Sequence, residues 1–69
     1  MEPNPALLKH IYAQAKRAFP DARVKVAGKD GGIMIRIGGR EYRLPVAPLP
    51  SEVQAQLEQA RVDRKAANG

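Results

Sequence analysis

The side chains of this sequence that can do chemistry are mainly cationic, and half of the twelve lysines and arginines belong to one segment in the middle of the chain. Between residues 22 and 46 apolar and polar residues alternate, and the cations at the polar positions are Arg23, Lys25, Arg36 and Arg43, with Lys29 in the first turn. Because successive side chains of a β-strand point to opposite faces of a sheet, the alternation predicts a basic face. Guanidinium and ammonium groups at strand spacing can bind the phosphates along a nucleic-acid backbone. We interpret these residues as a candidate nucleic-acid-binding surface, the alternative being a solvated face whose long side chains cover the strands.

The face predicted to be basic also contains Met34, but it contains no aromatic residue. A methionine flanked by arginines is typical of the apolar centre of a protein interface, and it is equally compatible with an isolated surface residue. The three aromatic residues, Tyr12, Phe19 and Tyr42, occupy positions that predict burial. Because sheets that bind single strands stack bases on exposed aromatic rings, we expect nucleic acid to be contacted through its backbone rather than its bases.

A second group of basic residues lies near the N-terminus, at Lys9, Lys16 and Arg17. An ordinary solvent-exposed helix face explains these residues as well as a binding surface does. His10 lies in the same segment, but a catalytic histidine needs an orienting carboxylate, and the neighbouring sequence supplies none. We therefore expect no catalytic residue and a non-enzymatic protein. A small nuclease toxin that uses His10 as its base is the hypothesis that ranks last.

The sequence contains no recognisable cofactor, metal or membrane motif. Its glycine-rich runs join strand to strand, whereas a phosphate-binding loop leads from a strand into a helix. There is no cysteine and only one histidine, so we expect neither a metal site nor a cofactor. No apolar run approaches the roughly 20 residues of a membrane span, and the N-terminus does not resemble a signal peptide. We therefore expect a soluble, cytoplasmic protein, in keeping with the lack of cysteine.

The charge of the chain favours an anionic partner. The formal net charge is +5; residues 1–50 carry nine lysines or arginines against four acids, whereas residues 51–69 carry three of each. A positive surface on the first part attracts polyanions, so we expect nucleic acid or an acidic protein surface as the partner, and no membrane. The alternative is a charge that serves solubility alone.

Local signals predict one helix followed by three strands. Asn4 and Pro5 suit the N-cap and first position of a helix over residues 5–19, whose apolar residues recur at helical spacing. The strands are expected at 22–27, 33–37 and 40–46, joined by tight turns at Asp30-Gly31 and Gly38-Gly39. Closing the chain on the second turn pairs residue 35 with 42 and 36 with 41 and gathers the apolar residues on one face. These residues are Val24, Val26, Ile33, Ile35, Ile37, Tyr42, Leu44 and Val46.

The last segment predicts a second helix with a thinner apolar stripe. Ser51 and Gln54 match a capping box, the helix is expected over residues 51–63, and residues 64–69 are expected to fray. The chain thus predicts a single small domain over residues 1–69. Its class is α+β, with the order α-β-β-β-α, a three-stranded antiparallel meander and two helices packed on one face. Pro45 predicts that the third strand is an edge, which allows pairing across a homodimer.

The predicted order of elements is similar to that of double-stranded-RNA-binding domains and of HicA-type toxins. The RNA-binding domains carry a run of lysines at the start of the second helix, where this chain has Pro50-Ser51-Glu52. The toxins carry a Gly-Ser-His stretch near the first hairpin, where this chain has the glycine-rich run of residues 28–32. The resemblance therefore covers the architecture, and no site residue is carried over from it.

These patterns lead to two main hypotheses. The first is a small basic non-enzymatic binding module that contacts the nucleic-acid backbone through the exposed sheet face. The second is a protein–protein adaptor or a homo-oligomeric small protein, for example from a phage or mobile element, that uses Met34, the strand edge or the second helix.

Overall fold

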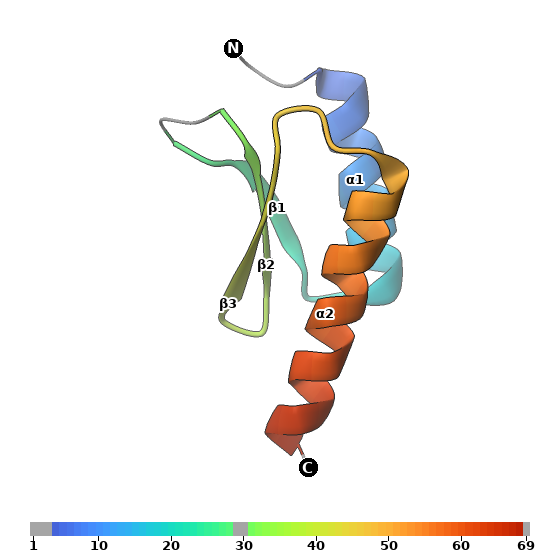
Figure 1. The fold of residues 1–69 in the computed structure, drawn as a ribbon, viewed down its shortest axis with the longest axis vertical. Helices are drawn as coiled ribbons and strands as arrows, with labels where there is room; N and C mark the ends of the chain where they lie inside the picture. The colour runs from blue at the N-terminus through green and yellow to red at the C-terminus, as the bar shows by residue number, and fades with distance from the viewer. Residues whose placement is uncertain (1–3, 29–30, 69) are drawn as a thin grey trace.

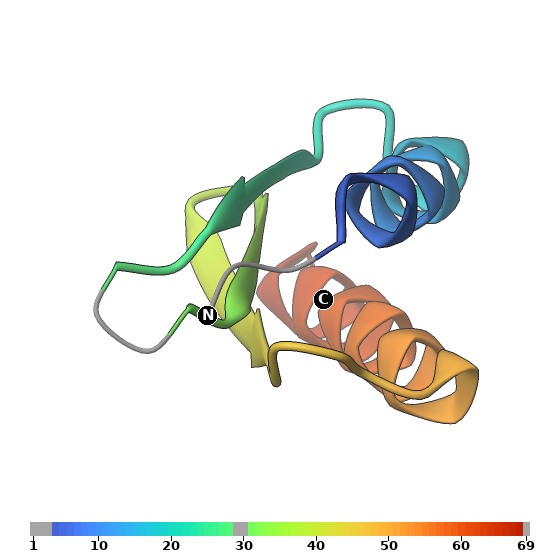
Figure 2. The same ribbon diagram turned by 90° about the horizontal axis from the view of Figure 1, so that it is seen from above.

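The computed structural model describes residues 4–28 and 31–68, with the side chain of residue 68 left out, and shows two helices beside a three-stranded sheet (Figure 1). The elements are α1 (Pro5–Ala18), β1 (Arg23–Val26), β2 (Ile33–Ile37), β3 (Arg40–Leu44) and α2 (Pro50–Asn68). The sheet is antiparallel with the order β1-β2-β3, and both helices lie on the same side of it (Figure 2). This confirms the predicted α+β fold. Within the described residues, no helix is long and apolar enough to cross a membrane.

Helix α1 begins and ends as its sequence predicts. The side chain of Asn4 accepts a hydrogen bond of 2.8 Å from the Ala6 N–H, and Pro5 occupies the first turn, where its missing N–H leaves no bond unmade. At the other end Phe19 leaves the helix in an extended conformation, with its N–H donating to the Ala15 carbonyl. The following proline prevents the helix from continuing.

The register of the β2–β3 hairpin is the predicted one. Ile35 lies opposite Tyr42 and Arg36 opposite Glu41. Gly38 and Gly39 have φ angles of 58° and 85°, the left-handed conformations that a type I′ turn requires at both central positions. Strand β3 stops at Leu44 rather than at residue 46, because Pro45 has no N–H to continue the ladder. Strand β1 is also shorter than the expected 22–27. The other predicted turn, at Asp30-Gly31, falls partly outside the described residues.

The core lies between the sheet and the helices. It is formed by residues of α1, β2, β3, α2 and the loop between α1 and β1, namely Ile11, Ala15, Phe19, Ala22, Ile33, Ile35, Ile37, Tyr42, Leu44, Val53, Leu57 and Ala60. Three valines of the predicted apolar face are exceptions: Val24 and Val46 are only partly buried, and Val26 is 41 % exposed. Val26 is exposed because it lies at the C-terminal end of β1, which leads away from both helices (Figures 1 and 2).

The predicted start of α2 is wrong by one residue. The predicted capping box of Ser51 and Gln54 is also wrong. The helix begins at Pro50, which suits the first helical position, so Ser51 is already inside it. Glu52 supplies the reciprocal contact, because its carboxylate accepts the Leu49 N–H at 2.9 Å. Gln54, which was expected to make that contact, instead donates to the side chain of Gln14 on α1 at 3.2 Å.

The prediction that residues 64–69 fray is also wrong for residues 64–68, because α2 continues to Asn68; residue 69 lies outside the described residues. Two polar side chains near residue 63 hold this part of the helix to the rest of the domain. Asp63 accepts a hydrogen bond of 2.7 Å from the Tyr42 hydroxyl. Arg64 donates to Asp21 at 2.8 Å, with its guanidinium 5.0 Å from the centre of the Phe19 ring. Polar contacts thus replace the apolar stripe that the last turns lack.

The backbone at Gly32, just before β2, passes so close to the backbone of Leu44 that only glycine fits there. A Cβ on Gly32 would lie 2.8 Å from the carbonyl oxygen of Leu44, whereas a Cβ on Gly28 would meet nothing within 4 Å. We expect Gly32→Ala to destabilise the protein by about 1–3 kcal/mol through overpacking, and Gly28→Ala to change stability by less than about 0.5 kcal/mol. Urea unfolding followed by circular dichroism measures both. Equal midpoints for the two variants would contradict the close approach.

Candidate nucleic-acid interface

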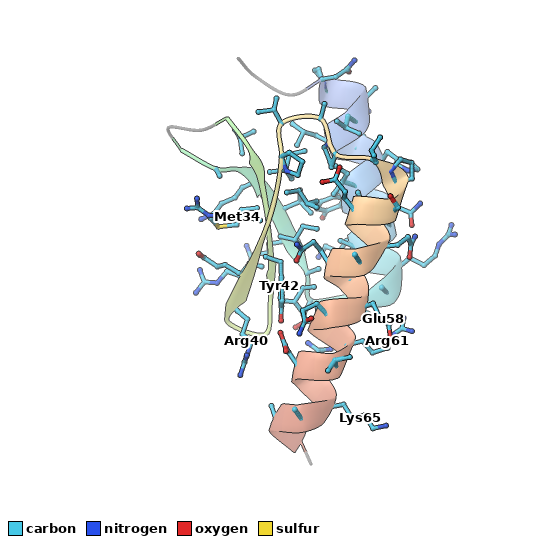
Figure 3. The ribbon with its side chains drawn as sticks, in the orientation of Figure 1. Met34, Arg40, Tyr42, Glu58, Arg61 and Lys65 are labelled. Carbon is cyan, nitrogen blue, oxygen red and sulfur yellow. The ribbon has the colours of Figure 1, made fainter. Side chains whose placement is uncertain are left out.

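The sheet face that points away from the helices carries two rows of side chains across the three strands. In one row Arg23, Arg36 and Glu41 are partners, and in the other Lys25, Met34 and Arg43. The four cations are exposed, and Figure 3 shows this face on the side of the sheet marked by Met34. The structure therefore brings four of the five predicted binding residues onto one surface, which we call the outer sheet face. Lys29, the fifth, lies outside the described residues.

Arg23 and Arg36 are directly opposite one another on β1 and β2. Like charges at such positions repel, which lowers the stability of the sheet. The two arginines line a shallow hollow of about 240 Å³ together with Asp21 and the Gly38-Gly39 turn. Two guanidinium groups on either side of a hollow can donate hydrogen bonds to the oxygens of one phosphate, which would also remove the repulsion.

The acidic side chains of the described residues neutralise only part of the outer sheet face. Three of them have partners away from it: Glu58 pairs with Arg61, Asp63 with Tyr42 and Arg40, and Glu52 with the Leu49 N–H. Asp21 pairs with Arg64 but also lines the hollow with Arg23 and Arg36, and Glu41 lies directly opposite Arg36. The two rows of the face contain four cations and one acid, so the face keeps a positive charge.

Met34 does not offer the exposed apolar surface expected of an interface centre. It points away from the helices, as its parity predicts, but only 7 % of it is exposed (Figure 3). Met34 lies on the central strand, between Lys25 and Arg43 on the two edge strands. The aliphatic stems of long cationic side chains cover neighbouring apolar groups in this way. The prediction of an exposed methionine is therefore wrong.

Tyr12 does not lie in the core, contrary to the sequence prediction. It is 48 % exposed, and the Lys16 ammonium lies 5.6 Å from the centre of its ring. The reason is its angular position on α1: at 100° per residue, Tyr12 stands about 100° from the fully buried Ile11, at the edge of the apolar stripe. The molecule therefore does have an exposed aromatic ring, on the helix rather than on the sheet.

The second basic group of the sequence is divided between two sides of α1. Lys16 lines a groove beside β1, whereas Arg17 lines a hollow beside α2, and Lys9 is exposed. His10 is exposed too, and its Nε2 lies 3.4 Å from the side-chain amide of Gln14. That neighbour is an amide rather than the carboxylate that would orient a catalytic histidine.

A polar cluster between β3 and α2 was not predicted from the sequence. The Tyr42 hydroxyl donates to one oxygen of Asp63, Gln59 donates to the other at 2.9 Å, and Arg40 lies 3.9 Å away. Burial raises the pKa of Tyr42, and the hydrogen bond to Asp63 and its charge add to this. The hydrogen bonds from Tyr42 and Gln59 lower the pKa of Asp63. Partial burial acts in the opposite direction and raises this pKa, while the positive charge of Arg40 lowers it further. A buried tyrosine needs a partner for its hydroxyl, but nothing in the sequence pointed to a residue 21 positions away.

This cluster predicts a loss of stability in acid. The pKa of Asp63 is lower in the folded protein than in the unfolded chain, so the ionised carboxylate stabilises the fold. This stabilisation is complete above the unfolded pKa of about 4. It is lost as the pH falls through the pKa of the folded protein. We expect Tyr42→Phe to lower the urea midpoint at pH 7 and to lower it less at pH 3. Tyr12→Phe, which removes an exposed hydroxyl, is the matched control and should change neither midpoint. An equal loss at both pH values in Tyr42→Phe would contradict the role of Asp63.

Chemically, the outer sheet face offers cationic hydrogen-bond donors. Arginine side chains there can bind phosphate or carboxylate oxygens, and the hollow between Arg23 and Arg36 is the point where two of them converge. Its function has to be argued from this geometry, because no protein-family model, no curated protein and no solved structure matches the chain.

Proposed function

We propose that the protein is a non-enzymatic module that binds nucleic acid through the phosphate backbone. Arg23, Lys25 and Arg36 are the principal phosphate ligands, and Arg43 extends the same surface. The observation that carries the proposal is the direct opposition of Arg23 and Arg36 around an open hollow. As part of the same proposal we place the protein in the cytoplasm, since a chain without cysteine suits a reducing compartment.

The cations of the outer sheet face repel one another, and a bound polyanion would offset this repulsion. Backbone pairing places the Cα atoms of Arg23 and Arg36 opposite one another, and a bound anion would offset the repulsion between their side chains further than Glu41, opposite Arg36, does. Lys25 lies two residues from Arg23, on the same face of β1. A chain of phosphates can contact all three cations at once, and contacts to phosphate carry no information about sequence. The proposal therefore implies binding that is sensitive to salt and tolerant of sequence.

The test is the salt dependence of nucleic-acid binding. Fluorescence anisotropy with a labelled duplex and a labelled single strand is measured at about 50 mM and about 200 mM salt. With three phosphate contacts, the affinity should fall by about 20- to 40-fold between the two concentrations. Absence of binding at the lower salt, or an affinity that does not change with salt, contradicts the proposal.

A second candidate function is interaction with another protein, and exposed apolar residues favour it. Val26 is exposed on the free edge of β1, and Val62 is 53 % exposed on α2. A second copy or another protein could cover either residue. The mass of the protein in solution tests the homo-oligomeric form: a stable dimer favours this function, and a monomer at high concentration excludes a second copy as the partner.

A further inference from the structure

A groove runs between α1 and the edge strand β1. It has a volume of about 430 Å³ and is lined by Tyr12 and Lys16 from α1, by Ala22, and by Arg23, Val24 and Lys25 from β1. Ala22 belongs to the loop that joins the two elements, and Figure 2 shows this loop from above. Strand β1 has β2 on one side only, so its other edge faces this groove or the solvent. The groove is therefore a hollow with one helical wall and one strand wall.

The helical wall carries the one aromatic ring of the chain that is not buried. Phe19 and Tyr42 are both in the core, whereas nearly half of Tyr12 is exposed. The Lys16 ammonium lies 5.6 Å from the centre of this ring and also donates to the Pro20 carbonyl at 3.0 Å. The exposed part of the tyrosine ring provides a flat apolar surface on which a nucleobase can stack.

Cations surround this ring, and no acid lines the groove. Lys16, Arg23 and Lys25 contribute the positive charge. The nearby Asp21 is held by Arg64 at 2.8 Å. Arg23 also lines the hollow on the outer sheet face with Arg36, so the groove and that face form one continuous basic surface.

We propose that the groove binds a nucleobase of a single-stranded nucleic acid, stacked on Tyr12, with the adjoining phosphates on Lys16, Arg23 and Lys25. The inference rests on the proposed backbone-binding function and specifies its substrate class. A duplex keeps the faces of its bases stacked on one another, so only an unpaired base can reach the Tyr12 ring. An aromatic ring next to a basic channel is the arrangement that sequence-tolerant single-strand binding requires.

The experiment compares strands that differ only in their bases. A labelled oligothymidylate of about twelve nucleotides, an abasic strand of the same length and a duplex of the same length are titrated with wild type, Tyr12→Ala and Tyr12→Phe at about 50 mM salt. Wild type should bind the oligothymidylate about 5- to 150-fold more tightly than the abasic strand, because that is the range of one stacked base. Tyr12→Ala should bind the two strands equally, and Tyr12→Phe, which keeps the ring, should behave as wild type. Circular dichroism checks that Tyr12→Ala is folded.

The outcomes separate this inference from the function on which it rests. If all three proteins bind the strands and the duplex with salt-dependent but base-independent affinity, the groove is not a base site, while backbone binding stands. If Tyr12→Ala keeps the full preference for oligothymidylate, Tyr12 is likewise not the base site, and backbone binding stands. If no nucleic acid binds at low salt, both proposals are overturned. Binding of polyglutamate but of no strand would assign the groove and the sheet face to an acidic protein instead.

Discussion

Reversing the charges of Arg23 and Arg36 together is expected to reduce nucleic-acid affinity by about 100-fold or more at low salt. In the proposed mode of binding, each arginine would supply a charge-assisted hydrogen bond to phosphate, of a kind that contributes about 1.5–3 kcal/mol. Two glutamates in the same positions remove both bonds and repel the strand. The slope of log affinity against log salt should also become shallower by about two, one for each lost phosphate contact. Anisotropy titrations at several salt concentrations measure both quantities.

The matched control reverses two cations on the opposite side of the molecule. Arg61 and Lys65 are exposed on α2, on its side away from the sheet (Figure 3). The double variant Arg61→Glu with Lys65→Glu changes the net charge by the same amount as Arg23→Glu with Arg36→Glu. If net charge alone attracts nucleic acid, the two double variants will lose affinity equally. A loss confined to the sheet variant locates the interface on the outer sheet face.

Replacing Ile35 by alanine is expected to remove a large part of the stability of the protein. Ile35 is fully buried in the middle of the central strand, between Val24 and Tyr42 on the neighbouring strands. Removing three carbons from such a site costs about 2–5 kcal/mol, and a chain of this length is stable by only about 3–10 kcal/mol. The urea midpoint followed by circular dichroism should therefore fall by about 2 M or more.

Two further substitutions show that this effect comes from the cavity. Ile35→Val leaves a smaller space and should cost about 0.5–1.5 kcal/mol. Val26→Ala removes carbons from a residue that is 41 % exposed, so it should cost less than Ile35→Ala. Equal midpoints for Ile35→Ala and Val26→Ala would show that the sheet face toward the helices is not the core.

The hairpin and its register could be predicted from the sequence because both depend on local chemistry. Gly38 and Gly39 are the two residues that adopt left-handed φ angles at the turn, and alternation with a period of two decides which side chains face inward. The cap at Asn4 is equally local, because its side chain reaches a backbone N–H two residues away. The same rule failed at the start of α2, where the helix begins at Pro50 and Glu52, rather than Gln54, accepts the hydrogen bond from the preceding backbone.

Exposure at the borders of the core could not be predicted in this way. Met34 has an outward parity but is covered, and Tyr12 has an apolar helical spacing but is exposed. Periodicity states which way a side chain points, whereas exposure depends on what the neighbouring elements place beside it. For the candidate site this difference was decisive, because the sequence patterns predicted a basic face with no accessible aromatic ring.

By itself, then, the sequence determined the order of elements, the pairing of β2 with β3 and the gathering of cations on one sheet face. These follow from backbone conformation and strand alternation, which act over a few residues. Only the tertiary structure decided that Asp21 and Asp63 are occupied by Arg64 and Tyr42, and that Tyr12 stands in the open beside Arg23. Those contacts join residues that are distant in the chain, and packing of the helices against the sheet is what brings them together.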